Sequence, residues 1–124
     1  MRERIFTPEA PEPIGPYSQA ILAEGVLFCS GQIPIDPQTG ELVAGDVAAQ
    51  AERAFRNLEA VLKAAGKSFD DVVRTSLYLV DMADFAAVNA IYDRCFGSAK
   101  PARSTIAVAA LPKGARIEID CVAL

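Results

Sequence analysis

The 124-residue sequence contains no histidine. It therefore has no imidazole base, no Ser–His or Cys–His pair and no histidine metal ligand. Any catalysis must come from carboxylates, tyrosine, arginine, hydroxyl groups, the backbone and water. The cysteines are also few, odd in number and far apart, at Cys29, Cys95 and Cys121. Their apolar surroundings favour buried reduced thiols over a disulfide or a metal site.

A long apolar run and an excess of positive charge are missing as well. No stretch of about 18 apolar residues is present, so we expect no membrane span. Met1–Phe6 leads directly to Thr7-Pro8 without an apolar signal core, which favours a cytoplasmic protein. The net charge of −4 argues against a nucleic-acid partner, which normally needs a basic patch. With 52% apolar and 23% charged residues, the chain is expected to fold as one domain over residues 1–124.

The apolar spacing predicts two helices among several strands, in the order β-β-α-β-α-β-β. Asp46 is a good N-cap for the first helix and Gly66 a good C-terminal stop, whereas Asp81 and Gly97 bound the second. The expected strands cover residues 17–23, 26–33 and 72–79, followed by two strands within residues 100–121. Ile5-Phe6 is a candidate edge strand, and the proline-rich stretch after it predicts a loop.

This order indicates an α+β fold with a single mixed sheet. Right-handed crossovers place both helices on the same face of that sheet. The strand at 26–33 has apolar residues on both of its faces, so the helix-free face is expected to be apolar too. An apolar face of this kind needs a partner, which predicts a closed homo-oligomer.

The last two strands carry the most informative charges. Arg103, Thr105 and Ala107 share one face of their strand, so the cation stands beside small residues with room for a small anion. A guanidinium can bind a carboxylate with two hydrogen bonds. On spacing alone, a structural salt bridge from Arg103 to Glu118 or Asp120 is slightly favoured. Glu118 is a candidate to activate a water molecule, or it is simply the cross-strand partner of a cation.

Four other positions are candidates for the same pocket. Tyr17 follows Gly15-Pro16, which could aim a rigid aromatic side chain over a ligand, although a packed tyrosine fits the pattern equally well. Ser30 and Gly31 permit close approach of a ligand, but a satisfied buried serine is the commoner outcome. Asn89 lies beside an apolar helix stripe and serves either a ligand or, as the pattern favours, the structure.

Several separated motifs occur in an order that resembles the Rid/YjgF family, also called the endoribonuclease L-PSP family. They are Gly15–Gln19 (GPYSQ), Ser30–Pro37 (SGQIPIDP), Asn57-Leu58, Val73–Met82 (VRTSLYLVDM), Phe85–Tyr92 (FAAVNAIY), Pro101–Ser104 (PARS), Leu111-Pro112 and Ile117–Ile119 (IEI). Arg103 is the mark of the RidA branch. The family pattern often has cysteine where this chain has Thr105, whose expected role is largely through its backbone.

The resemblance implies a fold similar to chorismate mutase and a barrel-like homotrimer with three sites at subunit interfaces. It implies hydrolytic deamination of reactive 2-imino acids, or their enamine tautomers, released by pyridoxal-phosphate enzymes, with no metal or other cofactor. Arg103, Glu118 and Tyr17 would be catalytic, and Ser30, Gly31, Asn89 and Thr105 would bind substrate together with Arg103 and Tyr17. The alternatives are a 2-oxo acid sensor without turnover, RNA cleavage or translation inhibition, and a chaperone-like role.

Overall fold

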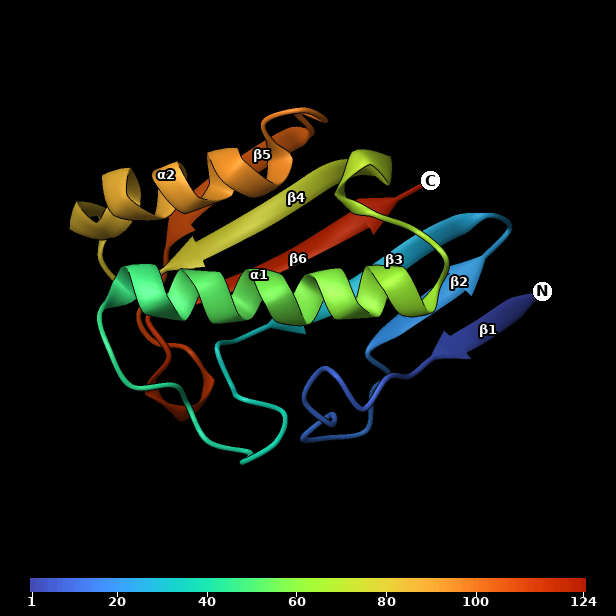
Figure 1. Cartoon of the computed structure of the whole chain (residues 1–124), viewed down its shortest axis with the longest axis horizontal. Coiled ribbons are helices and arrows are strands. Elements are labelled where there is room, and N and C mark those ends of the chain that lie inside the picture. Colours follow the sequence, from blue (N-terminus) through green and yellow to red (C-terminus); the bar gives the residue numbers. More distant parts are fainter.

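The computed structural model describes residues 1–124 as one six-stranded sheet with two helices on one face (Figure 1). The strands are β1 (Arg2–Ile5), β2 (Ala20–Ala23), β3 (Val26–Gln32), β4 (Val72–Leu79), β5 (Ala102–Ala107) and β6 (Ile117–Ala123). The helices are α1 (Val47–Ala64) and α2 (Phe85–Phe96). The strand order is β1-β2-β3-β6-β4-β5, and only β4 and β5 pair in parallel. The expected α+β fold with a mixed sheet is confirmed.

The ends of several elements differ from the prediction. The candidate edge strand at the start of the chain is present but earlier than predicted, because Arg2–Ile5 pairs along the whole of β2, whereas Phe6 lies outside it. The strand expected from residue 17 begins only at Ala20, since the backbone N–H of Tyr17 turns back to the carbonyl of Gly15. Asp81 caps a short 3₁₀ turn, Met82–Asp84, and α2 starts after that turn.

The first helix has the boundaries that its capping residues predict. The Asp46 carboxylate accepts a hydrogen bond from the backbone N–H of Ala49 at 3.0 Å. At the other end, Gly66 adopts a positive φ of 74°, and the following N–H returns to the carbonyl of Leu62. Between these caps, α1 buries Phe55, Leu58 and its other apolar residues against the sheet and α2.

The two faces of the sheet differ in what covers them. On β6, Ile117, Ile119 and Cys121 are buried beneath the helices, whereas Glu118 and Asp120 point to the helix-free face. That second face also carries Phe28, which is 51% exposed, and Ile106, which is 49% exposed. Apolar side chains therefore remain uncovered there, as the sequence predicts. Neither helix has the length and apolar character needed to cross a membrane.

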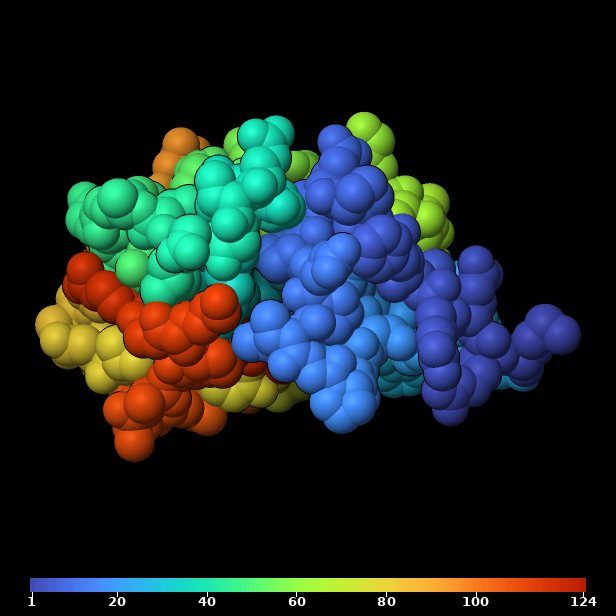
Figure 2. Space-filling view, turned by 90° about the horizontal axis from the view of Figure 1, so that it is seen from below, coloured from blue at the N-terminus to red at the C-terminus, as the bar shows by residue number.

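Three irregular segments meet at one end of the sheet. Figure 2 shows them together: the N-terminal segment in blue, the segment after β3 in cyan and the segment before β6 in orange-red. Buried amide side chains hold two of them in place. The amide of Gln19 donates to the carbonyls of Thr7, Ala10 and Pro11, and the amide of Asn57 donates to those of Ile33 and Ile35. These bonds replace the backbone pairing that the loops lack.

Candidate active site

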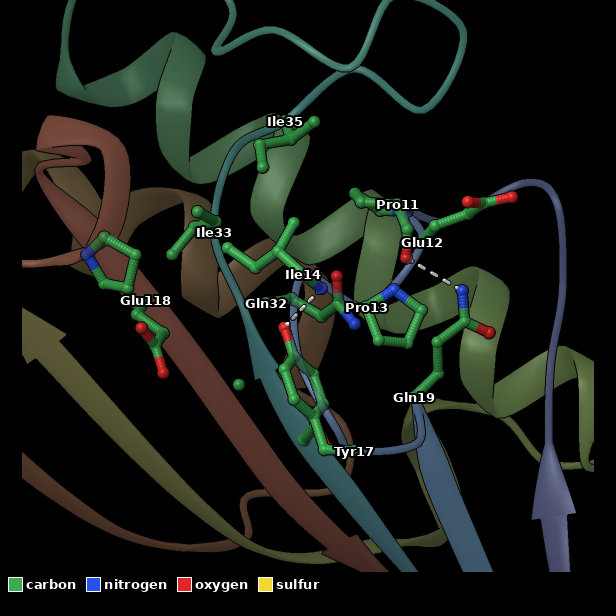
Figure 3. Close-up of a pocket in the computed structure, with 13 residues that line it drawn as sticks. Pro11, Glu12, Pro13, Ile14, Tyr17, Gln19, Gln32, Ile33, Ile35 and Glu118 are labelled. Carbon is green, nitrogen blue, oxygen red and sulfur yellow. Dashed lines mark hydrogen bonds between the residues drawn. The ribbon is translucent and has the colours of Figure 1, made fainter.

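A cavity of about 270 Å³ lies where the N-terminal segment passes over the ends of β3 and β6 (Figure 3). Its wall combines three prolines and three isoleucines with about as many polar side chains. The lining residues are Pro11, Glu12, Pro13, Ile14, Tyr17, Gln19, Ser30, Gly31, Gln32, Ile33, Ile35, Pro112 and Glu118. Four of the predicted site residues, Tyr17, Ser30, Gly31 and Glu118, are thus brought together. A concave cavity in which apolar walls surround convergent polar groups is typical of a small-molecule site.

The Glu118 carboxylate lines the cavity beside a bulge in β3. Cys29 pairs with Cys121 and Gln32 with Ile119, so Ser30 and Gly31 together stand opposite one residue of β6. A methyl group at Gly31 would overlap the Glu118 carboxylate, which explains the need for glycine there. Burial raises the pKa of Glu118, and the charge of nearby Asp120 raises it further.

Tyr17 and Ser30 are anchored beside this carboxylate. The Tyr17 hydroxyl accepts a hydrogen bond from the backbone N–H of Ile14 at 3.2 Å, and its side chain stands at the cavity edge (Figure 3). Tyr17 remains 49% exposed, so it is not the packed core tyrosine of the alternative interpretation. The Ser30 hydroxyl donates to the carbonyl of Ser18 at 2.6 Å. Ser30 is therefore satisfied by its own chain while it lines the cavity.

Arg103 lies on the other face of the sheet, at its β5 edge. One guanidinium nitrogen donates to the Asn89 side-chain oxygen at 2.9 Å. The guanidinium carbon lies 4.5 Å from the centre of the Tyr92 ring and 5.5 Å from that of Phe85, both on α2. Asn89 thus serves at least a structural role, and Thr105 lies on the same face, opposite Leu77 of β4.

The salt bridge considered for Arg103 is wrong. No carboxylate of the chain lies within ion-pair distance of Arg103. Alternation along the strands puts Arg103 under α2, whereas Glu118 and Asp120 point away from the helices. Asp120 instead accepts a hydrogen bond from the Tyr78 hydroxyl at 3.0 Å. The only groups that hold the cation are neutral.

Two residues beside Arg103, Tyr92 and Thr75, were not singled out in the sequence. The Tyr92 hydroxyl and the Thr75 hydroxyl share a hydrogen bond of 2.8 Å in the core, and Thr75 pairs directly with Arg103 in the sheet. In the sequence, Tyr92 reads as one member of an apolar helix stripe. The available signal was its position three residues after Asn89, on the same side of the helix.

The structure therefore presents two candidate regions on one chain: the Glu118 cavity, and the Arg103 corner formed by Arg103, Asn89 and the rings of Phe85 and Tyr92. The Glu118 cavity offers a carboxylate with a raised pKa, a phenol and a hydroxyl group, which suit proton transfer. The Arg103 corner offers an unpaired guanidinium, which suits a carboxylate ligand. No group of three or more cysteine, aspartate or glutamate side chains is arranged to hold a metal ion.

Comparison with known proteins gives relatives along the whole chain. Residues 7–124 match the family described as Endoribonuclease L-PSP. The human 2-iminobutanoate/2-iminopropanoate deaminase is 51% identical over all of this chain and 90% of its own length. A RutC family protein of Pyrococcus horikoshii is 53% identical over 99% of this chain and 98% of its own.

Solved structures agree with these sequence relatives. Escherichia coli TdcF with bound serine superposes with a TM-score of 0.93 at 40% identity, and the match covers 98% of each chain. The yjgF gene product of the same organism gives a TM-score of 0.92 at 44% identity, again over 98% of each chain. The likeness therefore extends over both candidate regions.

Proposed function

The chain belongs to the endoribonuclease L-PSP family, and we propose that it is a hydrolytic deaminase of 2-imino acids and their enamine tautomers, giving 2-oxo acids and ammonia. Relatives from human, mouse, rat and cattle, 47–51% identical, carry the name 2-iminobutanoate/2-iminopropanoate deaminase. The observation that carries the proposal is the Arg103 guanidinium, which only neutral groups of its own chain contact. A ligand carboxylate supplies the missing negative charge.

In the proposed reaction, Arg103 binds the substrate carboxylate and Glu118 acts on water. The Glu118 carboxylate takes a proton from a water molecule as the water oxygen bonds to the imine carbon, and it passes that proton to the imine nitrogen, which gives a neutral tetrahedral carbinolamine. Glu118 then takes the proton of the carbinolamine hydroxyl as the C=O bond forms and delivers it to the nitrogen. The C–N bond breaks, ammonia leaves, and Glu118 is again a carboxylate. Tyr17, Ser30 and the backbone at Gly31 and Thr105 shape the pocket.

As the two half-sites of one active site, the Glu118 cavity and the Arg103 corner require more than one copy of the chain. Arg103 and Glu118 lie on opposite faces of the sheet, so one chain does not bring them into the same cavity. We propose that the β5 edge of one subunit meets the helix-free face of the next. Such a contact joins two different surfaces, and it closes into a ring when the rotation allows. A homotrimer with three shared sites satisfies this requirement and covers Phe28 and Ile106.

The oligomeric state has a direct measurement. Light scattering at micromolar protein should give three times the monomer mass of 13.2 kDa. A monomer in solution would contradict the shared-site proposal. The three cysteines are free, which suits the reducing cytoplasm that we propose as the compartment.

The activity test couples the protein to a threonine dehydratase and follows imine decay by semicarbazone trapping. Wild-type protein should accelerate the decay, and Arg103→Ala should reduce kcat/KM by about 100-fold, since it removes the charged partner of the carboxylate. Arg94→Ala is the matched control, because Arg94 is an exposed arginine on α2 whose only ion pair is with Glu52. An Arg103→Ala variant with wild-type activity would refute this assignment.

A sensor of 2-oxo acids would use the same two half-sites without turnover. Calorimetry with 2-oxobutanoate, run beside the activity test, separates the two functions. Binding with no acceleration of imine decay would favour the sensor. A nuclease assay with metal-free protein tests the activity suggested by the family's other name, against which the net charge of −4 counts.

A further inference from the structure

We propose that Tyr92 is a positioning residue, which holds the Arg103 guanidinium in the orientation that receives the substrate carboxylate. The carboxylate assignment rests on the proposed function. The contact itself is in the structure: the guanidinium carbon of Arg103 lies 4.5 Å from the centre of the Tyr92 ring. A cation this close to an aromatic ring is attracted to the electrons of its face.

The Tyr92 ring is a fixed platform, because it is held on several sides. Its side chain is buried and stacks on Phe96 with the ring centres 4.5 Å apart, while Phe55 meets it edge-on at 6.0 Å. The hydroxyl bonds to Thr75, which is fully buried and directly opposite Arg103 in the β4–β5 pair. Tyr92 therefore links α2 to the strand beside the one that carries the cation.

This arrangement orders Arg103 without neutralising it. Asn89 accepts one N–H of the guanidinium, and the aromatic contact with Tyr92 restrains the group further. A guanidinium has five N–H donors, so four remain for a ligand. Arginine has a long, flexible side chain, and ordering it before binding reduces the entropy lost when a carboxylate arrives. An acidic partner would also have ordered it, but would have competed with the substrate.

Two substitutions separate the ring from its hydroxyl. Tyr92→Leu removes the aromatic face and keeps an apolar side chain in the core. It should weaken 2-oxobutanoate binding and raise KM by about three- to tenfold, with a smaller change in kcat. Tyr92→Phe keeps the face, so KM and affinity should stay within about twofold of wild type.

The stability of the protein, unlike its KM, should depend on the Tyr92 hydroxyl. Tyr92→Phe leaves the buried Thr75 hydroxyl without its partner and should lower Tm. The double variant Tyr92→Phe/Thr75→Val removes both polar groups and should recover most of that loss. A purely structural Tyr92 would instead make KM follow Tm across the three variants.

A spectroscopic signature makes the test independent of turnover. Aromatic ring currents should shift the Arg103 Nε–Hε resonance in wild-type protein and in Tyr92→Phe. In Tyr92→Leu the shift should fall to the smaller part that comes from the more distant Phe85 ring. Arg94, which is exposed, provides the reference resonance. If wild-type protein did not accelerate imine decay, the proposed function would be wrong, but the Arg103 resonance would still report on the contact with Tyr92. The role of Tyr92 would be overturned if folded Tyr92→Leu protein kept the wild-type Arg103 resonance. It would also be overturned if that variant kept the wild-type KM and 2-oxobutanoate affinity.

Discussion

The Arg103 corner and the Glu118 cavity are opposite in charge and in surroundings. At the corner, a cation is held by an amide oxygen and an aromatic ring, with no acid within ion-pair distance. In the cavity, a half-buried carboxylate has another acid nearby and no cation in the lining. One region has positive charge to offer, and the other has a proton acceptor.

Because Arg103 and Glu118 lie on opposite faces of the sheet, a single chain does not bring them into one cavity. Each region lacks what the other has, and the sheet separates them. An arginine with no acidic partner in its own chain remains available to a ligand carboxylate. Substitutions that alter one region at a time separate the contributions of the two.

The largest effect on kcat is expected from a substitution of Glu118. Glu118→Gln keeps the size of the side chain but removes the proton acceptor, so kcat should fall by about 10²- to 10⁴-fold. Binding of 2-oxobutanoate should change much less, because Arg103 is intact. Steady-state kinetics and calorimetry on the same preparation measure both quantities. Loss of binding with kcat unchanged would reverse the roles assigned to the two regions.

The second-largest effect on kcat is expected from a substitution in the β3 bulge, at Gly31. Gly31→Ala places a methyl group where the Glu118 carboxylate now lies, and the carboxylate must move away. A displacement of about 1 Å can cost about 100-fold in rate, so kcat should fall by that order. Gly25→Ala is a control for glycine loss, since nothing lies within 4 Å of its added carbon, although its positive φ will lower Tm. Wild-type turnover in Gly31→Ala would show that the position of Glu118 is unimportant.

The smallest effect concerns pH. The pKa of Glu118 is raised, so its basic form is lost as pH falls through a value above the ordinary glutamate pKa of about 4.3. The acidic limb of kcat/KM should therefore lie above that value. Asp120→Asn keeps an acceptor for the Tyr78 hydroxyl and removes the nearby charge, which should move the limb to lower pH. A shift of the acidic limb to higher pH in Asp120→Asn would contradict the proposal that the Asp120 charge raises the pKa of Glu118.

Much of the fold could be predicted from local pattern. The caps of α1 and the alternation in β6 are encoded by neighbouring residues, and both are confirmed. The short β1 was harder, because only Ile5 of its four residues is buried. Its pairing depends on β2, which is distant in sequence, and a four-residue pattern carries little information by itself.

The motifs suggest which residues are candidates for the site, but not how they are arranged. They point to Arg103 and Glu118, whereas spacing alone favoured a salt bridge between Arg103 and an acid of the next strand. Strand alternation within each element was known, but which face each strand turns to the helices depends on the whole sheet. Tyr92 was missed for a similar reason, since its contact with Arg103 forms only when α2 packs on β5.

A mixing experiment tests the shared site most directly. Arg103→Ala and Glu118→Gln chains are unfolded, mixed in equal amounts and refolded, and imine decay is compared with that of each variant alone. In a ring where each site takes Arg103 from one chain and Glu118 from the next, about a quarter of the sites should be intact, so about a quarter of wild-type activity should return. Mixed oligomers no more active than the separate variants would contradict the account.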